Sequence, residues 1–73
     1  MEPEEAEEAL LDPQRISRDV YNIAGERRRG AVGTSEAGRI LFVVFTIRRG
    51  RVRIITVRDA TLVEKRRYRR RGK

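Results

Sequence analysis

The residues of this sequence that could carry chemistry are arginines at the ends of apolar segments, beside a few carboxylates. They are Glu26-Arg27, Arg53 and Arg58-Asp59. The chain has no histidine and no cysteine, which excludes the commonest general base, thiolate catalysis and cysteine-based metal sites. Phosphate-binding, dinucleotide and nucleophile-elbow motifs are absent. We therefore expect no metal and no cofactor.

Metal-free RNA cleavage is the reaction that suits such a set of arginines. Its transition state carries extra negative charge on the phosphoryl oxygens, which preorganised guanidinium groups stabilise. The candidate catalytic residues are therefore Arg58, Arg53, Arg27 and Glu26. The candidate bases for the 2′-hydroxyl are Glu26, Asp59, Glu64 and Tyr68.

A structural interpretation of the same residues stays open. Taken alone, these residues favour a structural role, Glu26-Arg27 as a surface ion pair of little energetic value and Asp59 as a residue that brackets a helix. Arg58 stands apart, because an arginine that ends an apolar strand directly before a helix lies at a sheet edge.

The charge distribution favours a polyanionic partner. The 73 residues carry a net charge of +7, but all six charged residues of the first twelve are acidic. Of the 18 basic residues, 16 are arginine, whose planar fork binds phosphate bidentately. We expect RNA as the partner, although a bias toward arginine as a solubilising residue would give the same count. The candidate nucleic-acid-binding residues are Arg28, Arg39, Arg66, Arg67 and Arg70.

The length allows one domain, residues 1–73, of the α+β class. An acidic helix is predicted for 3–11, with Ala6, Ala9 and Leu10 on one apolar stripe and a stop at Asp12-Pro13. Segments 15–23 and 27–33 are weaker extended segments, and a turn is predicted at 34–38. Together with the segments below they form a small antiparallel sheet of three or four strands.

The strongest strand signal covers 39–47, which is apolar on both faces and so is expected at the centre of the sheet. Arg48-Arg49-Gly50 predicts a hairpin with the glycine at positive φ, and 51–57 returns antiparallel. In a regular strand Val52, Ile54 and Thr56 share one face. Arg53 would then stand in a row with Ile55 and Val57, as a charge among apolar side chains.

A basic helix closes the chain. Thr61-x-x-Glu64 is a capping-box pattern, which predicts the start of the helix. Arginines crowd the segment that follows, so residues 66–73 are expected to form a frayed, solvated tail or to bind a phosphate backbone. The longest apolar run has six residues and the N-terminus is acidic, so we expect neither a membrane segment nor a secretory signal, and a cytoplasmic location.

Residues 38–46 (GRILFVVFT), residues 51–61 (RVRIITVRDAT) and Glu64 with Tyr68 resemble the C-terminal half of the BrnT toxin family. The family pattern is approximately Gly-Arg-[Leu/Ile]-Leu-x-Val-x-[Phe/His]-Thr, then [Ile/Val]-Arg-[Ile/Val]-Ile-[Ser/Thr]-Ala-Arg-x-Ala-Thr-x-x-Glu. Glu26-Arg27 and Gly33 are similar to its Glu-Arg…Gly segment, and 3–13 to a helix that precedes it.

The resemblance implies a RelE-like fold, a type II toxin–antitoxin role, metal-independent ribonuclease activity and a BrnA-type antitoxin that also binds operator DNA. It assigns Arg53 and Arg58 to the family's strand-end arginines, and Glu26 and Arg27 to its Glu-Arg pair. Val57 departs from the family's alanine. A first strand and a helix ending near Lys-His-Gly have no counterpart, so the resemblance predicts a truncated fold whose free sheet edge a homodimer or a partner's strand covers.

Three functions remain in competition. The retained Arg-Ile-Ile-Thr-Val-Arg segment favours a toxin that cleaves RNA. The missing histidine favours a non-catalytic nucleic-acid-binding module, a degenerate toxin. A basic body also suits an interaction subunit held by an acidic antitoxin. Few aromatic residues are present, so RNA would be bound mainly through phosphates and with strong salt dependence.

Overall fold

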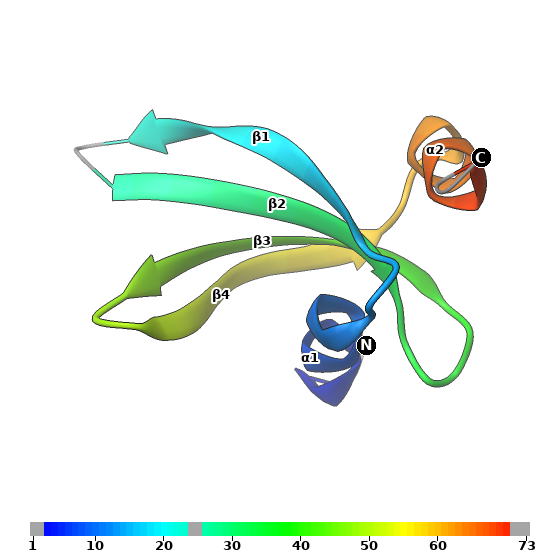
Figure 1. Cartoon of the computed structure of the whole chain (residues 1–73), viewed down its shortest axis with the longest axis horizontal. Coiled ribbons are helices and arrows are strands. Elements are labelled where there is room, and N and C mark those ends of the chain that lie inside the picture. Colours follow the sequence, from blue (N-terminus) through cyan, green and yellow to red (C-terminus); the bar gives the residue numbers. More distant parts are fainter. Residues whose placement is uncertain (1–2, 24–25, 71–73) are drawn as a thin grey trace.

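In a computed structural model of the chain, two helices pack against opposite faces of a four-stranded antiparallel sheet (Figure 1). Residues 3–23 and 26–70 are described, without the side chains of residues 3, 19–23 and 26. The elements in chain order are α1 (Pro3–Leu11), β1 (Ile16–Ile23), β2 (Glu26–Thr34), β3 (Ile40–Arg48), β4 (Arg51–Asp59) and α2 (Leu62–Arg70). The strands lie side by side in that same order. The predicted α+β class is confirmed.

Two small cores lie on the two faces of the sheet. On the face that we call the α1 side, Ala6 and Ala9 of the helix pack against Leu41 and Val43 of β3. On the opposite face, the α2 side, Tyr68 packs with Val32 and with partly buried residues that include Phe42. Because successive residues of β3 point to opposite faces, this strand supplies both cores. Its predicted central position is confirmed.

The acidic helix docks unusually close to β2. A Cβ atom added to Gly33 would lie 2.2 Å from the backbone oxygen of Ala9. Ala6 and Ala9 are 2% and 1% exposed, so the small side chains of the predicted stripe face the sheet as expected. Small residues on both elements let the two backbones meet, which explains how a helix of nine residues stays docked.

A β-bulge in β4 overturns the predicted facing of that strand. Val44 pairs with Thr56 but the next residue, Phe45, pairs with Ile54, so Ile55 is the extra residue. Beyond a bulge the alternation of side chains shifts by one position. Val52, Ile54 and Val57 therefore face the α1 side, and Arg53 faces the α2 side with Thr56 and Arg58. The prediction that Arg53 stands among apolar side chains, with Thr56 opposite, is wrong for this reason.

The hairpin between β3 and β4 has a two-residue loop. Arg48 pairs with Arg51, and the loop residues Arg49 and Gly50 have φ values of 52° and 77°. Two positive φ values are the mark of a type I′ turn, which Asn-Gly forms best. The predicted positive φ at Gly50 is confirmed, and Arg49 holds the same left-handed conformation at a steric cost.

Arg49→Asn is expected to raise the free energy of unfolding by about 0.5–1 kcal/mol, because asparagine tolerates the left-handed conformation. Urea denaturation followed by circular dichroism measures the change. Arg49→Gln is the control, since it removes the same charge without that tolerance. An equal gain in both variants would assign the effect to relief of charge repulsion and contradict the turn explanation.

At the C-terminus, the capping box predicted from Thr61 and Glu64 marks the start of α2, which continues to Arg70. Residues 66–70 of the expected frayed tail are thus helical. Residues 71–73 lie outside the described part of the chain. Neither α1 nor α2 has the length and apolar character needed to cross a bilayer.

Candidate functional site

A buried carboxylate, Glu64, organises the α2 side of the sheet. It lies in the first turn of α2 and is 4% exposed. The Thr61 N–H donates to its Oε1 at 2.8 Å, and the Glu64 N–H donates to the Thr61 hydroxyl at 3.2 Å. These reciprocal bonds satisfy two backbone donors of the helix start and fix the carboxylate in place.

Arg58 binds this carboxylate with both terminal nitrogens. Nη1 donates to Glu64 Oε1 at 2.9 Å, and Nη2 donates to Oε2 at 3.0 Å. Nη1 also donates to the backbone oxygen of Asp59 at 3.1 Å. The guanidinium carbon lies 4.4 Å from the centre of the Phe42 ring. A guanidinium held by three hydrogen bonds over a ring face has a fixed position and plane, although 47% of the side chain is exposed.

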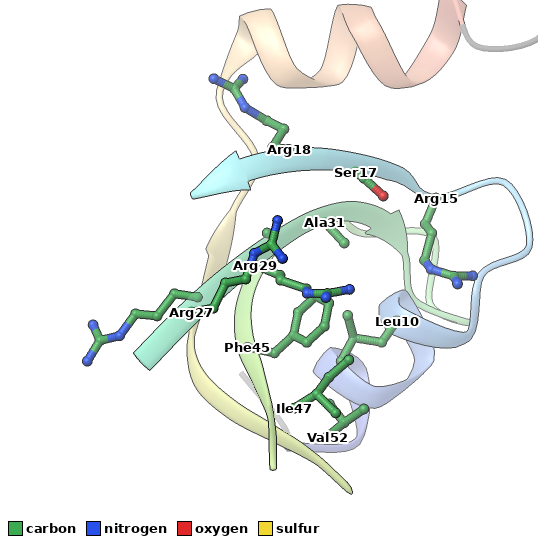
Figure 2. Close-up of a pocket in the computed structure, with 12 residues that line it drawn as sticks. Leu10, Arg15, Ser17, Arg18, Arg27, Arg29, Ala31, Phe45, Ile47 and Val52 are labelled. Atoms are coloured by element: carbon green, nitrogen blue, oxygen red, sulfur yellow. The ribbon is translucent and has the colours of Figure 1, made fainter. Parts of the chain in front are cut away.

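A second arginine reaches the same carboxylate from the opposite edge of the sheet. Arg18 lies on β1, and its Nη1 is 3.8 Å from Glu64 Oε2. Figure 2 shows its side chain pointing toward α2. Gly30 is the partner of Arg18 on β2 and offers no side chain in its path. The two edge strands thus bring two cations to one anion above the sheet.

The pKa of Glu64 reflects these contacts. Burial raises the pKa, but the hydrogen bonds from Arg58 and Thr61 and the Arg58 charge outweigh burial, so the pKa lies below its ordinary value of 4.5. The carboxylate is therefore ionised at neutral pH and is a weak base. We conclude that Glu64 positions Arg58 and does not accept a proton there.

Tyr68 and Asp12 tie α2 to the other end of the chain. The Tyr68 hydroxyl donates a very short hydrogen bond to Asp12 Oδ2. The same oxygen accepts the Thr34 N–H at 3.0 Å, and Oδ1 accepts the Gln14 N–H at 2.9 Å. Tyr68 is 6% exposed. Its hydroxyl is thus a buried structural donor, which removes it from the candidate bases.

The four predicted catalytic residues do not form one cluster. Arg53 and Arg58 lie on the α2 side of β4. Arg27 is on the α1 side, because it lies two residues before Arg29 on β2 and so shares its face. Arg29 pairs with Phe45, which faces the α1 side. Glu26 begins β2 and its backbone pairs with Ile23, while its side chain lies outside the described set.

The predicted nucleic-acid-binding arginines are also divided. Arg28 faces the α2 side by alternation along β2, and the three predicted residues on α2 are exposed: Arg66, Arg67 and Arg70. Arg39 instead lies 3.8 Å from Glu5 of α1. The α2 side thus carries Arg18, Arg28, Arg53 and Arg58 under a basic helix, and the α1 side carries Arg27 and Arg29.

Sequence reasoning missed Arg18, Phe42 and Asp12. Phe42 looked like one more apolar residue of the central strand, and Asp12 looked like a helix stop. The approach of Arg18 to Glu64 follows from strand order and register, which no local pattern encodes. Within residues 3–23 and 26–70, no group of three or more acidic side chains is arranged to hold a metal ion.

Comparison with known families gives one match. The model of a family described as a ribonuclease toxin, BrnT, of a type II toxin–antitoxin system matches residues 1–64. A search of curated proteins finds no match. The matched residues include α1, the four strands and the first turn of α2. They contain Arg18, Arg58 and Glu64.

Proposed function

Since the chain belongs to the BrnT family of ribonuclease toxins of type II toxin–antitoxin systems, we propose that it cleaves RNA without a metal ion and that Arg58 stabilises the transition state. Membership of this family implies ribonuclease activity and an antitoxin partner. The metal-free mechanism and the role of Arg58 rest on the arrangement around Glu64. An enzyme of this kind would meet its RNA in the cytoplasm.

The observation that carries the proposal is the set of donors that Arg58 keeps for a ligand. A guanidinium has five N–H donors. Three of them are used by Glu64 and the Asp59 backbone oxygen. The remaining two, on Nε and Nη2, lie on one edge of the guanidinium plane, and no described residue accepts them. That edge is a ready bidentate site for two phosphoryl oxygens, held in place before substrate arrives.

Neighbouring cations support the same site. Arg18 approaches Glu64 from β1, and Arg53 lies on the same face as Arg58 further along β4. A phosphodiester placed against Arg58 would therefore lie on a basic surface, on the face that α2 with its exposed arginines also covers. Such a surface binds the backbone of RNA without reading its sequence.

Transition-state charge stabilisation is the mechanism that these residues support best. Glu64 is ionised and paired, and the Tyr68 hydroxyl is held by Asp12, so neither is available to deprotonate a 2′-hydroxyl. Asp59 is exposed and its side chain faces the α1 side, away from Arg58. Binding without cleavage, as in a degenerate toxin, is the second candidate function because, among the side chains that the structure describes, no well-placed base accompanies Arg58.

Arg58→Ala is expected to lower the rate of RNA cleavage by about 10²-fold or more, the usual effect of removing a preorganised oxyanion donor. The cleavage rate of Arg58→Lys should lie between those of the wild type and Arg58→Ala. A lysine ammonium cannot bind Glu64 and a phosphate bidentately at the same time. The assay uses purified protein and a labelled single-stranded RNA, in parallel reactions with and without EDTA. Circular dichroism confirms that each variant is folded.

Arg51→Lys is the matched control, because Arg51 is an exposed arginine at the hairpin end of the same strand. Its activity should equal that of the wild type. Loss of wild-type cleavage in EDTA would overturn the metal-free mechanism. Salt-sensitive RNA binding by a wild-type protein that never cleaves would establish the second candidate function.

A further inference from the structure

A groove on the α1 side of the sheet is separate from the Arg58 site. It lies between α1 and the strands near the hairpin end, and it has a volume of about 830 Å³. Its floor is apolar and its rim is cationic (Figure 2). Arg18 lies at the edge of this groove, but its side chain points toward α2 on the opposite face, where Glu64 and Arg58 also lie. The proposed RNA site therefore leaves the groove unexplained.

The floor exposes aliphatic side chains. Ile47 and Val52 are cross-strand partners, and they are 47% and 55% exposed. Leu10 of α1 and Phe45 of β3 line the same groove and are half-buried. Figure 2 shows these four side chains on one side of the sheet, pointing into a common space. Exposed apolar side chains gathered in this way mark a binding surface for another apolar group.

The rim is formed by arginines. Arg15, Arg27 and Arg29 are exposed and line the groove. No salt bridge joins Arg27 or Arg29 to a carboxylate whose side chain is described. A complementary ligand therefore brings carboxylates for the rim and large apolar side chains for the floor.

We propose that this groove binds an acidic amphipathic segment of a partner protein, whose apolar side chains cover Ile47 and Val52 and whose carboxylates pair with Arg27 and Arg29. This rests on the proposed function only in that the family's antitoxin is the natural source of the segment. RNA fits less well, because the most exposed floor residues are aliphatic and give no ring face on which a base can stack.

A second copy of the chain is also a poorer occupant. Each copy carries a net charge of +7, so two copies repel each other. The acidic helix of a second copy would offer Leu11, which is 78% exposed, as its large exposed apolar side chain. A single leucine does not cover a floor of four apolar residues.

The test uses a synthetic amphipathic peptide of leucine, phenylalanine and glutamate, labelled for fluorescence anisotropy at physiological salt. Comparison peptides replace the apolar residues with serine or the glutamates with lysine. The full chain should bind the acidic amphipathic peptide at least tenfold more tightly than either. The double substitution Ile47→Ser and Val52→Ser should weaken this binding at least tenfold.

Leu62→Ser with Val63→Ser is the matched control, because these α2 residues are as exposed as the groove residues, at 62% and 54%. This variant should bind the peptide like the wild type, and so should Arg58→Ala, whose rate of RNA cleavage is expected to fall. Equal loss in both double variants would overturn the groove as the binding surface. So would a single-stranded RNA that displaces the peptide, or a wild-type dimer that the groove substitutions convert to monomer.

Discussion

Gly33→Ala is expected to lower the free energy of unfolding by about 3 kcal/mol, at the upper end of the cost of overpacking. The added methyl group would meet the Ala9 backbone oxygen at 2.2 Å, far inside van der Waals contact. Because the obstacle is backbone, no rotamer change relieves it, and α1 must move off the sheet. In a domain of this size such a loss removes much of the total stability.

Urea denaturation measures this loss, and proteolysis at the α1–β1 connection reports whether the helix has detached. Gly38→Ala is the matched control, since a Cβ there would meet nothing within 4 Å while φ is +84°. It should cost about 1–2 kcal/mol through backbone strain alone. A Gly33→Ala protein as stable as the wild type would contradict the close approach of α1 to β2.

Glu64→Ala is expected to lower the free energy of unfolding by about 2–3 kcal/mol, the range for charge-assisted hydrogen bonds and a helix cap lost together. The substitution removes the acceptors of the Arg58 Nη1 and Nη2 hydrogen bonds and of the Thr61 N–H. Thr61→Ala, which removes one side of the capping box, should cost about 1 kcal/mol. Chemical denaturation at neutral pH measures the free energy of unfolding of each variant.

The contribution of Glu64 should also depend on pH. Its pKa in the folded protein lies below the ordinary value of 4.5, so the carboxylate stabilises the fold fully above that pH. The stabilisation is lost as the pH falls through the lowered folded pKa, where the group becomes protonated. The difference in unfolding free energy between wild type and Glu64→Gln should therefore shrink between neutral pH and pH values below 4.5. A difference that stays constant would show that the charge of Glu64 is not used.

Much of the fold could be predicted because its strongest signals are local. An apolar run on both faces gave the central position of β3, and Thr61 with Glu64 gave the start of α2. The side of the sheet that the residues of β4 before Ile55 face could not be predicted. Ile55 is the extra residue of the bulge, and a bulge residue has no distinctive chemistry in sequence. One extra residue reversed the expected position of Arg53.

The candidate site was predictable only in part, for the same reason. Arg58 stood out because an arginine between an apolar strand and a helix is unusual, and its Phe42 and Glu64 partners complete a site around it. Arg18 needed the register of β1 on β2, and Asp12 needed the contact with Tyr68, which is 56 positions away. Contacts of that kind depend on the assembled sheet and leave no trace in a sequence window.

The chain-order arrangement of the strands has a consequence for how the molecule folds. Each strand pairs with its neighbour in sequence, so the sheet forms by zipping successive hairpins, with little loop entropy lost at each step. The hydrogen bond from Tyr68 to Asp12 instead closes a loop of most of the chain. We therefore expect rapid folding in which the sheet forms first and α2 docks last. The hydrogen bonds between Arg58 and Glu64 would then form late, after the sheet surface below them.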